Sequence, residues 1–170
     1  TENINNITRD IITYIIKSDN EVHRETAFWQ ALLFDPASQG HKALLTKAYL
    51  SGINPRQHYS LYLIQFCNLS DYFQLPIQQK QVEEPTAILS GFYSKVRSQL
   101  GNQLHSFWLV EHEESCVVIL PVSQDAQVLN EPAFFVSIAQ ALEKQYDGAR
   151  IRVSKGSVIT SLEQTPRALM

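Results

Sequence analysis

One acidic stretch holds the side chains best suited to chemistry, and it falls between two apolar runs. Glu111-His112-Glu113-Glu114-Ser115 separates the predicted strands Leu104–Glu111 and Ser115–Val122, so the pattern predicts a hairpin with a polar turn at His112-Glu113-Glu114. Carboxylates in such a turn supply the oxygen ligands that Mg²⁺ prefers. Adjacent acids at the tip of a hairpin are more often solvated turn residues, and we interpret these two acids in that way.

Outside this turn the sequence contains no arrangement typical of an active site. It has no Gly-x-Ser-x-Gly nucleophile elbow, no glycine-rich phosphate loop and no paired-acid site. Ser154-Lys155-Gly156-Ser157 could contact an anion, but a stretch of this composition is more often a plain turn. The histidines lack the spacing of metal ligands; they are His23, His41, His58, His105 and His112. We therefore predict no catalytic residue, no metal site and no cofactor, and we assign no cofactor-binding residue.

Both cysteines fall inside predicted apolar strands, which favours buried packing residues over a disulfide or a metal pair. If Tyr59–Cys67 and Ser115–Val122 are antiparallel neighbours, Cys67 at the end of one strand faces Cys116 at the start of the other. Burial raises the pKa of a thiol and lowers its reactivity. We therefore expect the two thiols to lie close together and to stay reduced.

The composition limits the classes of protein to consider. The 170 residues are 44% hydrophobic and 18% charged, which fits one compact domain with a helical appendage. A net charge of −3 gives no electrostatic reason to expect nucleic-acid binding. No apolar run approaches the roughly 20 residues of a membrane span, and no signal-peptide pattern is visible. We expect a cytoplasmic protein with no membrane partner.

Four strands and two helices follow one another over residues 59–154. The predicted strands are Tyr59–Cys67, Leu104–Glu111, Ser115–Val122 and Ala149–Ser154, and the predicted helices are Thr86–Leu100 and a helix between the cap Asn130 and Asp147. Asn68–Pro85, rich in glutamine, is predicted to be a long loop. The βαββαβ order and the right-handed crossover rule predict a ferredoxin-like α+β fold. Its antiparallel sheet would have the spatial order last–first–third–second strand, with both helices on one face.

The first strand is apolar on both faces, so both faces of the sheet must be covered. Leu61 and Leu63 lie on one face, and Tyr62 and Phe66 lie on the other, where we also place Trp108; the pattern leaves open which of the two sets the helices cover. An apolar patch of this size is rarely left bare on a monomer. We predict that residues 1–50 cover the second face; a second chain is the alternative.

The N-terminal 50 residues are predicted to be helical. Ile4, Ile7, Ile11, Ile12 and Ile15 show helical spacing, Ser18-Asp19-Asn20 is predicted to end that helix, and helices over Val22–Phe34 and Ser38–Leu50 follow. The first helix either docks on the same domain or connects to an upstream, dimerising module. We place the boundary between a helical connector, residues 1–37, and the main domain, residues 38–170. Gly52 is predicted to terminate the last helix.

Several segments together resemble a known family. They are FWQALLFD, ALLTKAYLSGIN, HYSLYLIQF, SFWLVEHEESCVVILPV, IRVSKGSV and LEQTPRALM, and the resemblance covers Val22–Met170. In this order they resemble the GGDEF-like domain in the middle of bacterial transcriptional regulators of the sugar-diacid and purine-catabolism types, the CdaR and PucR families. The resemblance implies a GGDEF-like sheet preceded by N-terminal helices.

The resemblance also implies where a catalytic relative would carry its site. GGDEF diguanylate cyclases have a Gly-Gly-(Asp/Glu)-Glu-Phe turn, in which glycines allow close approach of a nucleotide. The equivalent turn here, Glu111–Ser115, lacks the glycines, and Cys116 replaces the aromatic residue. The metal-binding acid near the end of the first strand has only Asn68 and Asp71 as candidates. The resemblance therefore implies a domain that is not an enzyme.

Full-length members of these families resemble one-component transcription factors with a sensory region, this middle domain and a C-terminal helix-turn-helix. The 170 residues contain no such DNA reader, so we expect no specific DNA binding by this chain. We expect a regulatory and oligomerisation domain, a homodimer, that relays a signal from an upstream sensory module to a downstream DNA-binding domain. The alternatives are a small-molecule sensor with a pocket between residues 1–50 and the sheet, and a degenerate nucleotide cyclase.

Overall fold

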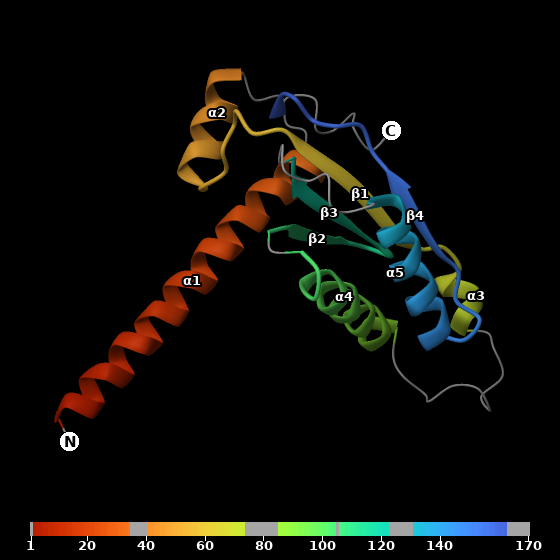
Figure 1. The fold of residues 1–170 in the computed structure, drawn as a ribbon, viewed down its shortest axis with the longest axis horizontal. Helices are drawn as coiled ribbons and strands as arrows, with labels where there is room; N and C mark the ends of the chain where they lie inside the picture. Colours follow the sequence, from red (N-terminus) through yellow and green to blue (C-terminus); the bar gives the residue numbers. More distant parts are fainter. Residues whose placement is uncertain (1, 35–40, 74–84, 105, 123–130, 163–170) are drawn as a thin grey trace. The chain divides into compact units, whose positions relative to one another are not determined.

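The computed structural model describes residues 2–34, 41–73, 85–104, 106–122 and 131–162 (Figure 1). The chain divides into two compact units, one built mainly from Thr1–Arg56 and the other mainly from Gln57–Thr160. The first unit contains helices and the second contains a sheet with its own helices. None of the helices in the described part of the chain combines the length and apolar character of a membrane span.

In the first unit, helix α1 extends from Glu2 to Phe34 without interruption. The predicted break at Ser18-Asp19-Asn20 is therefore wrong. These three residue types each cost less than about 0.7 kcal/mol relative to alanine inside a helix, and neither glycine nor proline is present to stop it. The C-terminal part of α1 buries Phe28, Trp29 and Leu33.

Helix α2, His41–Leu50, ends at the glycine that the sequence predicts as its terminator. Gly52 has φ +82°, and its N–H donates to Tyr49 O at 3.1 Å while the N–H of Ile53 donates to Ala48 O at 2.9 Å. These two bonds form a Schellman motif, which satisfies carbonyls that the helix end leaves without partners. Ala48 and Ile53 are both buried, so the apolar contact that usually accompanies this motif is also available.

In the second unit, four strands form one antiparallel sheet in the order β2-β3-β1-β4. The strands are β1 (Tyr59–Phe66), β2 (Trp108–His112), β3 (Ser115–Pro121) and β4 (Ile151–Lys155). This order confirms the predicted sequence of last, first, third and second strand, and with it the α+β fold class. The predicted loop Asn68–Pro85 begins instead with a short helix, α3 (Leu69–Phe73), and residues 74–84 lie outside the described part.

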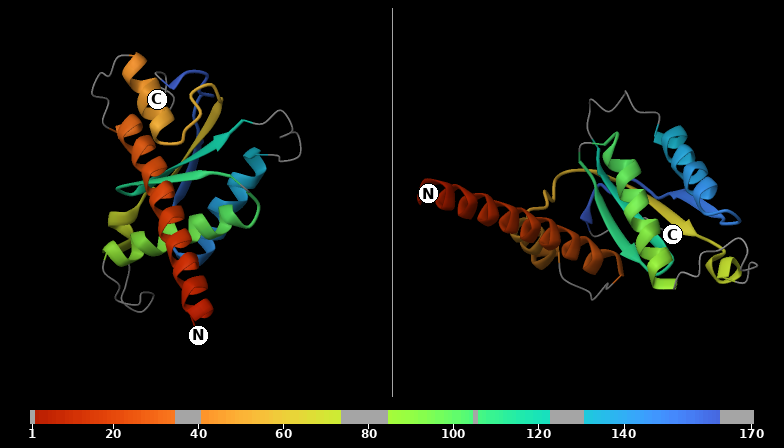
Figure 2. Two further views of the ribbon diagram at one scale, coloured as in Figure 1. Left: turned by 90° about the vertical axis from the view of Figure 1, so that its left-hand side faces the viewer. Right: turned by 90° about the horizontal axis from the view of Figure 1, so that it is seen from below.

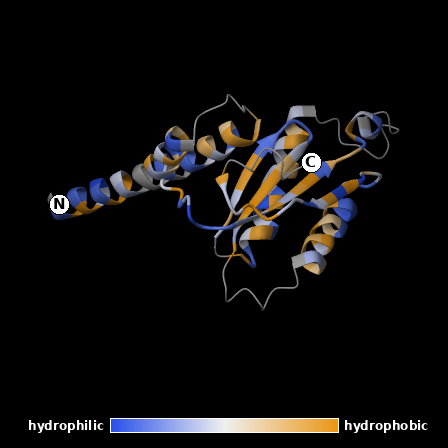
Figure 3. Ribbon diagram, turned by 90° about the horizontal axis from the view of Figure 1, so that it is seen from above, coloured by the Kyte–Doolittle hydropathy of each residue, from blue (hydrophilic) through white to orange (hydrophobic). Residues whose placement is uncertain are grey.

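Helices α4 (Pro85–Gly101) and α5 (Glu131–Gln145) cover one face of this sheet (Figure 2). Tyr62 of β1 stacks on Phe135 of α5 with ring centroids 3.8 Å apart, and Phe66 meets Phe92 of α4 edge-on at 5.7 Å. Apolar residues concentrate on the strands and the inner sides of both helices (Figure 3). Aromatic contacts of this kind add about 0.5–1.5 kcal/mol each to the burial of the rings.

The opposite face of the sheet is also buried, which agrees with the double apolar pattern of β1. Leu61, Val117 and Ile119 have no exposed surface. The predicted position of Trp108 is wrong, because Trp108 pairs with Ile119 and so lies on this face instead of beside Tyr62. Its ring contacts that of Tyr59 edge-on at 5.8 Å.

The predicted pairing of the two cysteines is also wrong. Cys116 is buried opposite Ile64, whereas Cys67 is exposed and follows the last residue of β1. The N–H of Phe66 donates to Glu114 O, which lies in the turn before the first residue of β3, so β3 does not extend far enough to pair with Cys67. The N–H of Cys67 donates to Arg150 O instead, at 2.8 Å. Both thiols are free.

Candidate functional site

The turn between β2 and β3 contains two residues, Glu113 and Glu114, enclosed by the pair of His112 and Ser115. Glu113 has φ +51°, the left-handed conformation that costs a residue with a side chain about 1–2 kcal/mol. Two-residue hairpin loops usually place glycine at such a position. Glu113 therefore occupies a backbone position that favours glycine.

The carbonyl oxygens of this turn are already occupied by protein donors. The hydroxyl of Tyr93, on α4, donates to Glu113 O, and the Ser115 hydroxyl donates to His112 O at 2.9 Å. The N–H of Phe66 donates to Glu114 O at 2.8 Å. These three bonds attach the turn to α4, to β3 and to the end of β1. The turn is therefore fixed in place, and these oxygens already carry one hydrogen bond each.

The groups around the turn favour protonated, unreactive side chains. Burial, followed by the nearby Glu111, raises the pKa of the Cys116 thiol to about 12, with an opposing effect of Arg97. Burial, followed by Cys116 and then the acids of the turn, raises the pKa of Tyr93 to about 12. At neutral pH Tyr93 is thus a hydrogen-bond donor, and Cys116 is not a nucleophile. Arg97 Nη2 lies 3.6 Å from Glu111 Oε1, but both side chains are about half exposed, so this ion pair contributes little.

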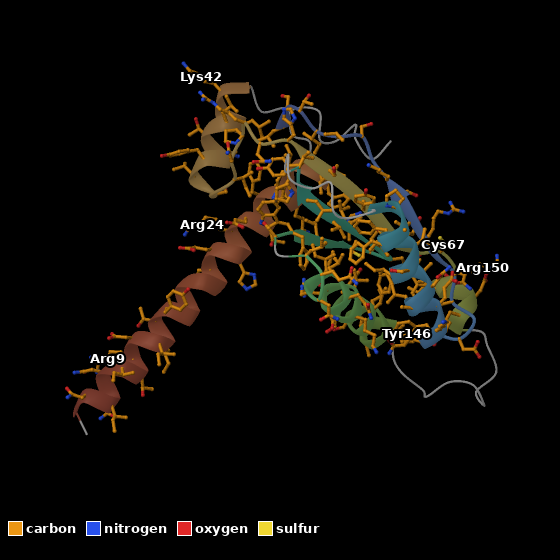
Figure 4. The ribbon with its side chains drawn as sticks, in the orientation of Figure 1. Arg9, Arg24, Lys42, Cys67, Tyr146 and Arg150 are labelled. Atoms are coloured by element: carbon orange, nitrogen blue, oxygen red, sulfur yellow. The ribbon has the colours of Figure 1, made fainter. Side chains whose placement is uncertain are left out.

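Asn68 follows β1 and joins it to the segment that leads into β4. Its Nδ2 donates to Gly148 O at 2.8 Å, and the N–H of Arg150 donates to its Oδ1 at 2.6 Å. Cys67 and Arg150 lie at this same end of the sheet (Figure 4). The amide side chain thus uses both its donor and its acceptor to fix this segment. A carboxylate could accept the second bond but could not make the first.

A second side chain fixes the start of β4. The N–H of Ile151 donates to Oε1 of Glu143, on α5, at 3.0 Å. Because β4 is the last strand of the described sheet, its outward N–H groups have no strand partner within that sheet. Asn68 and Glu143 together therefore hold the segment that enters the sheet at this edge.

The acids that the sequence suggested as metal ligands remain at the surface. Glu113 and Glu114 are exposed at the hairpin tip, and Asp71 is exposed on α3. Among the residues that the structure describes, no group of three or more His, Cys, Asp or Glu side chains is arranged to hold a metal ion. Asn68 lies at the predicted end of the first strand, but its side chain is engaged with backbone groups.

The candidate anion-binding stretch at the end of β4 is also engaged. The Lys155 ammonium lies 5.7 Å from the centre of the Tyr62 ring, in reach of a cation–π interaction. The N–H of Gly156 donates to Leu61 O at 2.8 Å. The interpretation of Ser154–Ser157 as a plain turn is wrong, because Ser154 and Lys155 are the last two residues of β4 and pair with β1.

Sequence reasoning did not find Tyr93 or Glu143 as functional side chains. Tyr93 follows Phe92, a buried residue of α4. This neighbour was the single signal in the sequence that Tyr93 lies near the sheet. Glu143 lies on the polar side of a helix pattern, where most acids are solvated. Neither position carries a motif, because each contact depends on the packing of α4 or α5 over the sheet.

Comparison with known proteins gives a family match. Residues 37–170 match the family model described as a GGDEF-like domain. The search of curated proteins gave no match, and the search of solved structures gave none either. The match covers most of the chain and includes the whole sheet with the turn at Glu113 and the end of β1.

Proposed function

The chain belongs to the GGDEF-like domain family, and from this we propose that it is a non-catalytic regulatory domain of a bacterial transcriptional regulator. In this role it relays a signal from an upstream sensory module to a downstream DNA-binding domain. The regulator is of the CdaR or PucR type and acts in the cytoplasm. The chain itself binds no DNA, in keeping with its net charge of −3.

The observation that carries the proposal is the state of the β2–β3 turn. A nucleotide phosphate can approach a backbone closely where glycines leave it uncovered. Here the turn has acidic side chains at both positions, and Glu111 adds a third carboxylate next to it. Its carbonyl oxygens accept bonds from Tyr93, Ser115 and Phe66. A catalytic GGDEF turn also carries acids, so the features that distinguish this turn are the missing glycines and its three attachments, which do not rearrange at low cost.

The end of β1 supports the same conclusion. Catalysis of phosphoryl transfer depends on metal ions held by carboxylates. After β1 and Cys67 comes an amide residue, Asn68. Both polar atoms of its side chain form hydrogen bonds with backbone groups of the segment that leads into β4. This residue stabilises the sheet edge, a role for which an acid is poorly suited. A domain that keeps the sheet and loses these groups is suited to transmission instead of chemistry.

Incubation of the chain with GTP and Mg²⁺ tests the catalytic half of the proposal. We expect no nucleotide turnover by chromatography of the reaction mixture, with an active diguanylate cyclase assayed in parallel as the control. Turnover that disappears in Glu113→Gln or Glu114→Gln would overturn the proposal. Turnover that persists in both variants would point to a contaminating enzyme, which repurification with a second affinity tag would remove.

The regulatory half is tested in the full-length protein. We expect the coding sequence downstream of Met170 to encode a helix-turn-helix within roughly 100 residues, the size of one domain. Deleting the sheet unit should leave operator binding by that segment intact and abolish its response to the inducing signal in a reporter assay. A full-length protein without a DNA-binding segment, or an unchanged response after the deletion, would contradict the proposal.

A further inference from the structure

The N-terminal half of α1 exposes an apolar stripe with the spacing of a coiled-coil seam. Ile4, Ile7, Ile11 and Tyr14 are separated by three, four and three residues, the alternation of the a and d positions of a heptad. Their exposed fractions are 68%, 59%, 54% and 72%. At 3.6 residues per turn the four side chains lie within an arc of about 80°. We propose that this stripe is a self-association site whose partner is the same stripe of a second copy of the chain, in a parallel pair.

The composition of the helix requires such a partner. Among residues 3–14, Arg9 is the single strong helix former, and the others are Asn, Ile, Thr, Asp and Tyr. Each of these types costs several tenths of a kcal/mol relative to alanine. Isolated helices are marginal in water even for alanine-rich sequences. The helix over these residues therefore depends on packing, and the stripe is the apolar surface that can supply it.

A second copy in parallel orientation fits this stripe. Parallel pairing in register places each stripe residue against its own counterpart, isoleucine on isoleucine and tyrosine on tyrosine, so that every layer joins side chains of equal size. An antiparallel pair over the same stripe would place Ile4 opposite Tyr14 and create unequal layers. Twofold symmetry is also the commonest arrangement of identical chains.

The area of the stripe sets the strength of the pair. Each copy contributes the four side chains of the stripe; Ile12, although 50% exposed, lies about 120° around the helix from the centre of the stripe and does not take part. With about 100 Å² lost per side chain, two copies bury roughly 800 Å². This lies below the range of about 1,200–2,000 Å² for stable interfaces and within the class of weak, transient contacts. The fraction of paired chains should therefore change with protein concentration, as it would for a regulatory contact. The regulatory role of the pair rests on the proposed function, whereas the pairing itself does not.

Sedimentation equilibrium of the 170-residue chain tests the association. We expect a dimer with a dissociation constant on the order of micromolar. Ile7→Glu/Ile11→Glu should weaken it by at least about tenfold, because four carboxylates then meet in the seam. The matched control, Asn6→Glu/Thr13→Glu, adds the same charge on the opposite side of the helix and should leave association unchanged. All four positions are exposed, and far-UV circular dichroism of each variant checks that the sheet unit remains folded.

Disulfide trapping tests the orientation. In a Cys67→Ser background, which removes the exposed thiol, Ile7→Cys should form a covalent dimer under mild oxidation. Thr13→Cys, on the far side of the helix, should not. Cys116 remains, since it is buried.

The outcomes that overturn the pairing are separate from those that bear on the proposed function. A wild-type chain that stays monomeric at about 100 µM, an equal loss of association in the control variant, or a trimer would each overturn the proposal. Trapping confined to a mixture of Ile4→Cys and Tyr14→Cys chains would overturn the parallel orientation. None of these results changes the expectation for GTP, and GTP turnover would leave the pairing intact.

Discussion

Asn68 is the side chain whose replacement tests the interpretation of the site most directly. It makes two hydrogen bonds to backbone groups, at 2.8 Å to Gly148 O and at 2.6 Å from the N–H of Arg150. A typical intramolecular hydrogen bond contributes about 0.5–1.5 kcal/mol net, so Asn68→Ala should lower the free energy of unfolding by about 1–3 kcal/mol. For a domain of this size that corresponds to a decrease in Tm of roughly 2–12 °C.

Asn68→Asp changes a single atom type and separates the two bonds. The carboxylate keeps the bond from Arg150, which becomes charge-assisted, but it loses the bond to Gly148 and places a negative oxygen next to that carbonyl oxygen. The lost bond and the repulsion outweigh the stronger bond, and we expect a loss of about 1–2 kcal/mol. The amide hydrogen of Arg150 should exchange faster with solvent in Asn68→Ala and remain protected in Asn68→Asp.

Urea unfolding followed by circular dichroism measures the stabilities, and hydrogen exchange followed by NMR measures the amide. Asn20→Asp is the matched control, because it makes the same chemical change at an exposed position in the middle of α1, away from both helix ends, and should be neutral. An Asn68→Asp variant as stable as the wild type, or an Arg150 amide whose exchange does not change in Asn68→Ala, would refute the role assigned to Asn68.

Three further predictions follow from backbone conformation and buried ionisable groups. Glu113→Gly should raise the free energy of unfolding by up to about 1 kcal/mol, because glycine adopts φ +51° without strain; a loss in urea unfolding would contradict this. Gly52→Ala should cost about 1–2 kcal/mol, because its φ is +82° and its Cβ would lie 3.3 Å from a glutamate oxygen, whereas Gly101→Ala, with open space around it, should be neutral or stabilising in the same measurement. The pKa values of Cys116 and Tyr93 are raised to about 12 from ordinary values of 9 and 10, so the unfolded chain loses these protons at lower pH than the folded chain does. The urea midpoint should therefore fall as the pH rises from about 9 towards 12, and it should fall less steeply in Cys116→Ala. A midpoint that rises over this range would contradict the assignment.

The fold was predictable because its strands and helices have strong local signals and few permitted connections. The apolar runs at β1 and β3 identify strands, and the βαββαβ order with right-handed crossovers leaves one order for the sheet. Gly52 was predicted to end α2 because a residue with φ above zero at that point favours glycine. These signals are local or topological, so a single sequence carries them.

The errors concern features that depend on register and packing. Cys116 pairs with Ile64, three residues before Cys67, so the predicted alignment of β1 and β3 was wrong by three residues. Such a difference in register leaves the apolar pattern of each strand unchanged, so the sequence does not reveal it. The face of Trp108 depends on the same register. The continuity of α1 depends on small propensity differences that the rest of a long helix can offset. Sequence patterns specify the elements more strongly than their alignment.

The side chains that would carry catalysis, at the tip of the β2–β3 turn and just after β1, lie outside the core, and for this reason they can change while the fold is retained. Tyr62, Phe66 and Phe135 are buried within the sheet and its helices, and their replacement would remove several kcal/mol of apolar stabilisation each. Glu113 is exposed, and its unfavourable φ costs about 1–2 kcal/mol, which the bonds to the turn can offset. Membership of the GGDEF-like family therefore determines the sheet, whereas the activity depends on a few residues at the turn and the end of β1 that the core does not constrain.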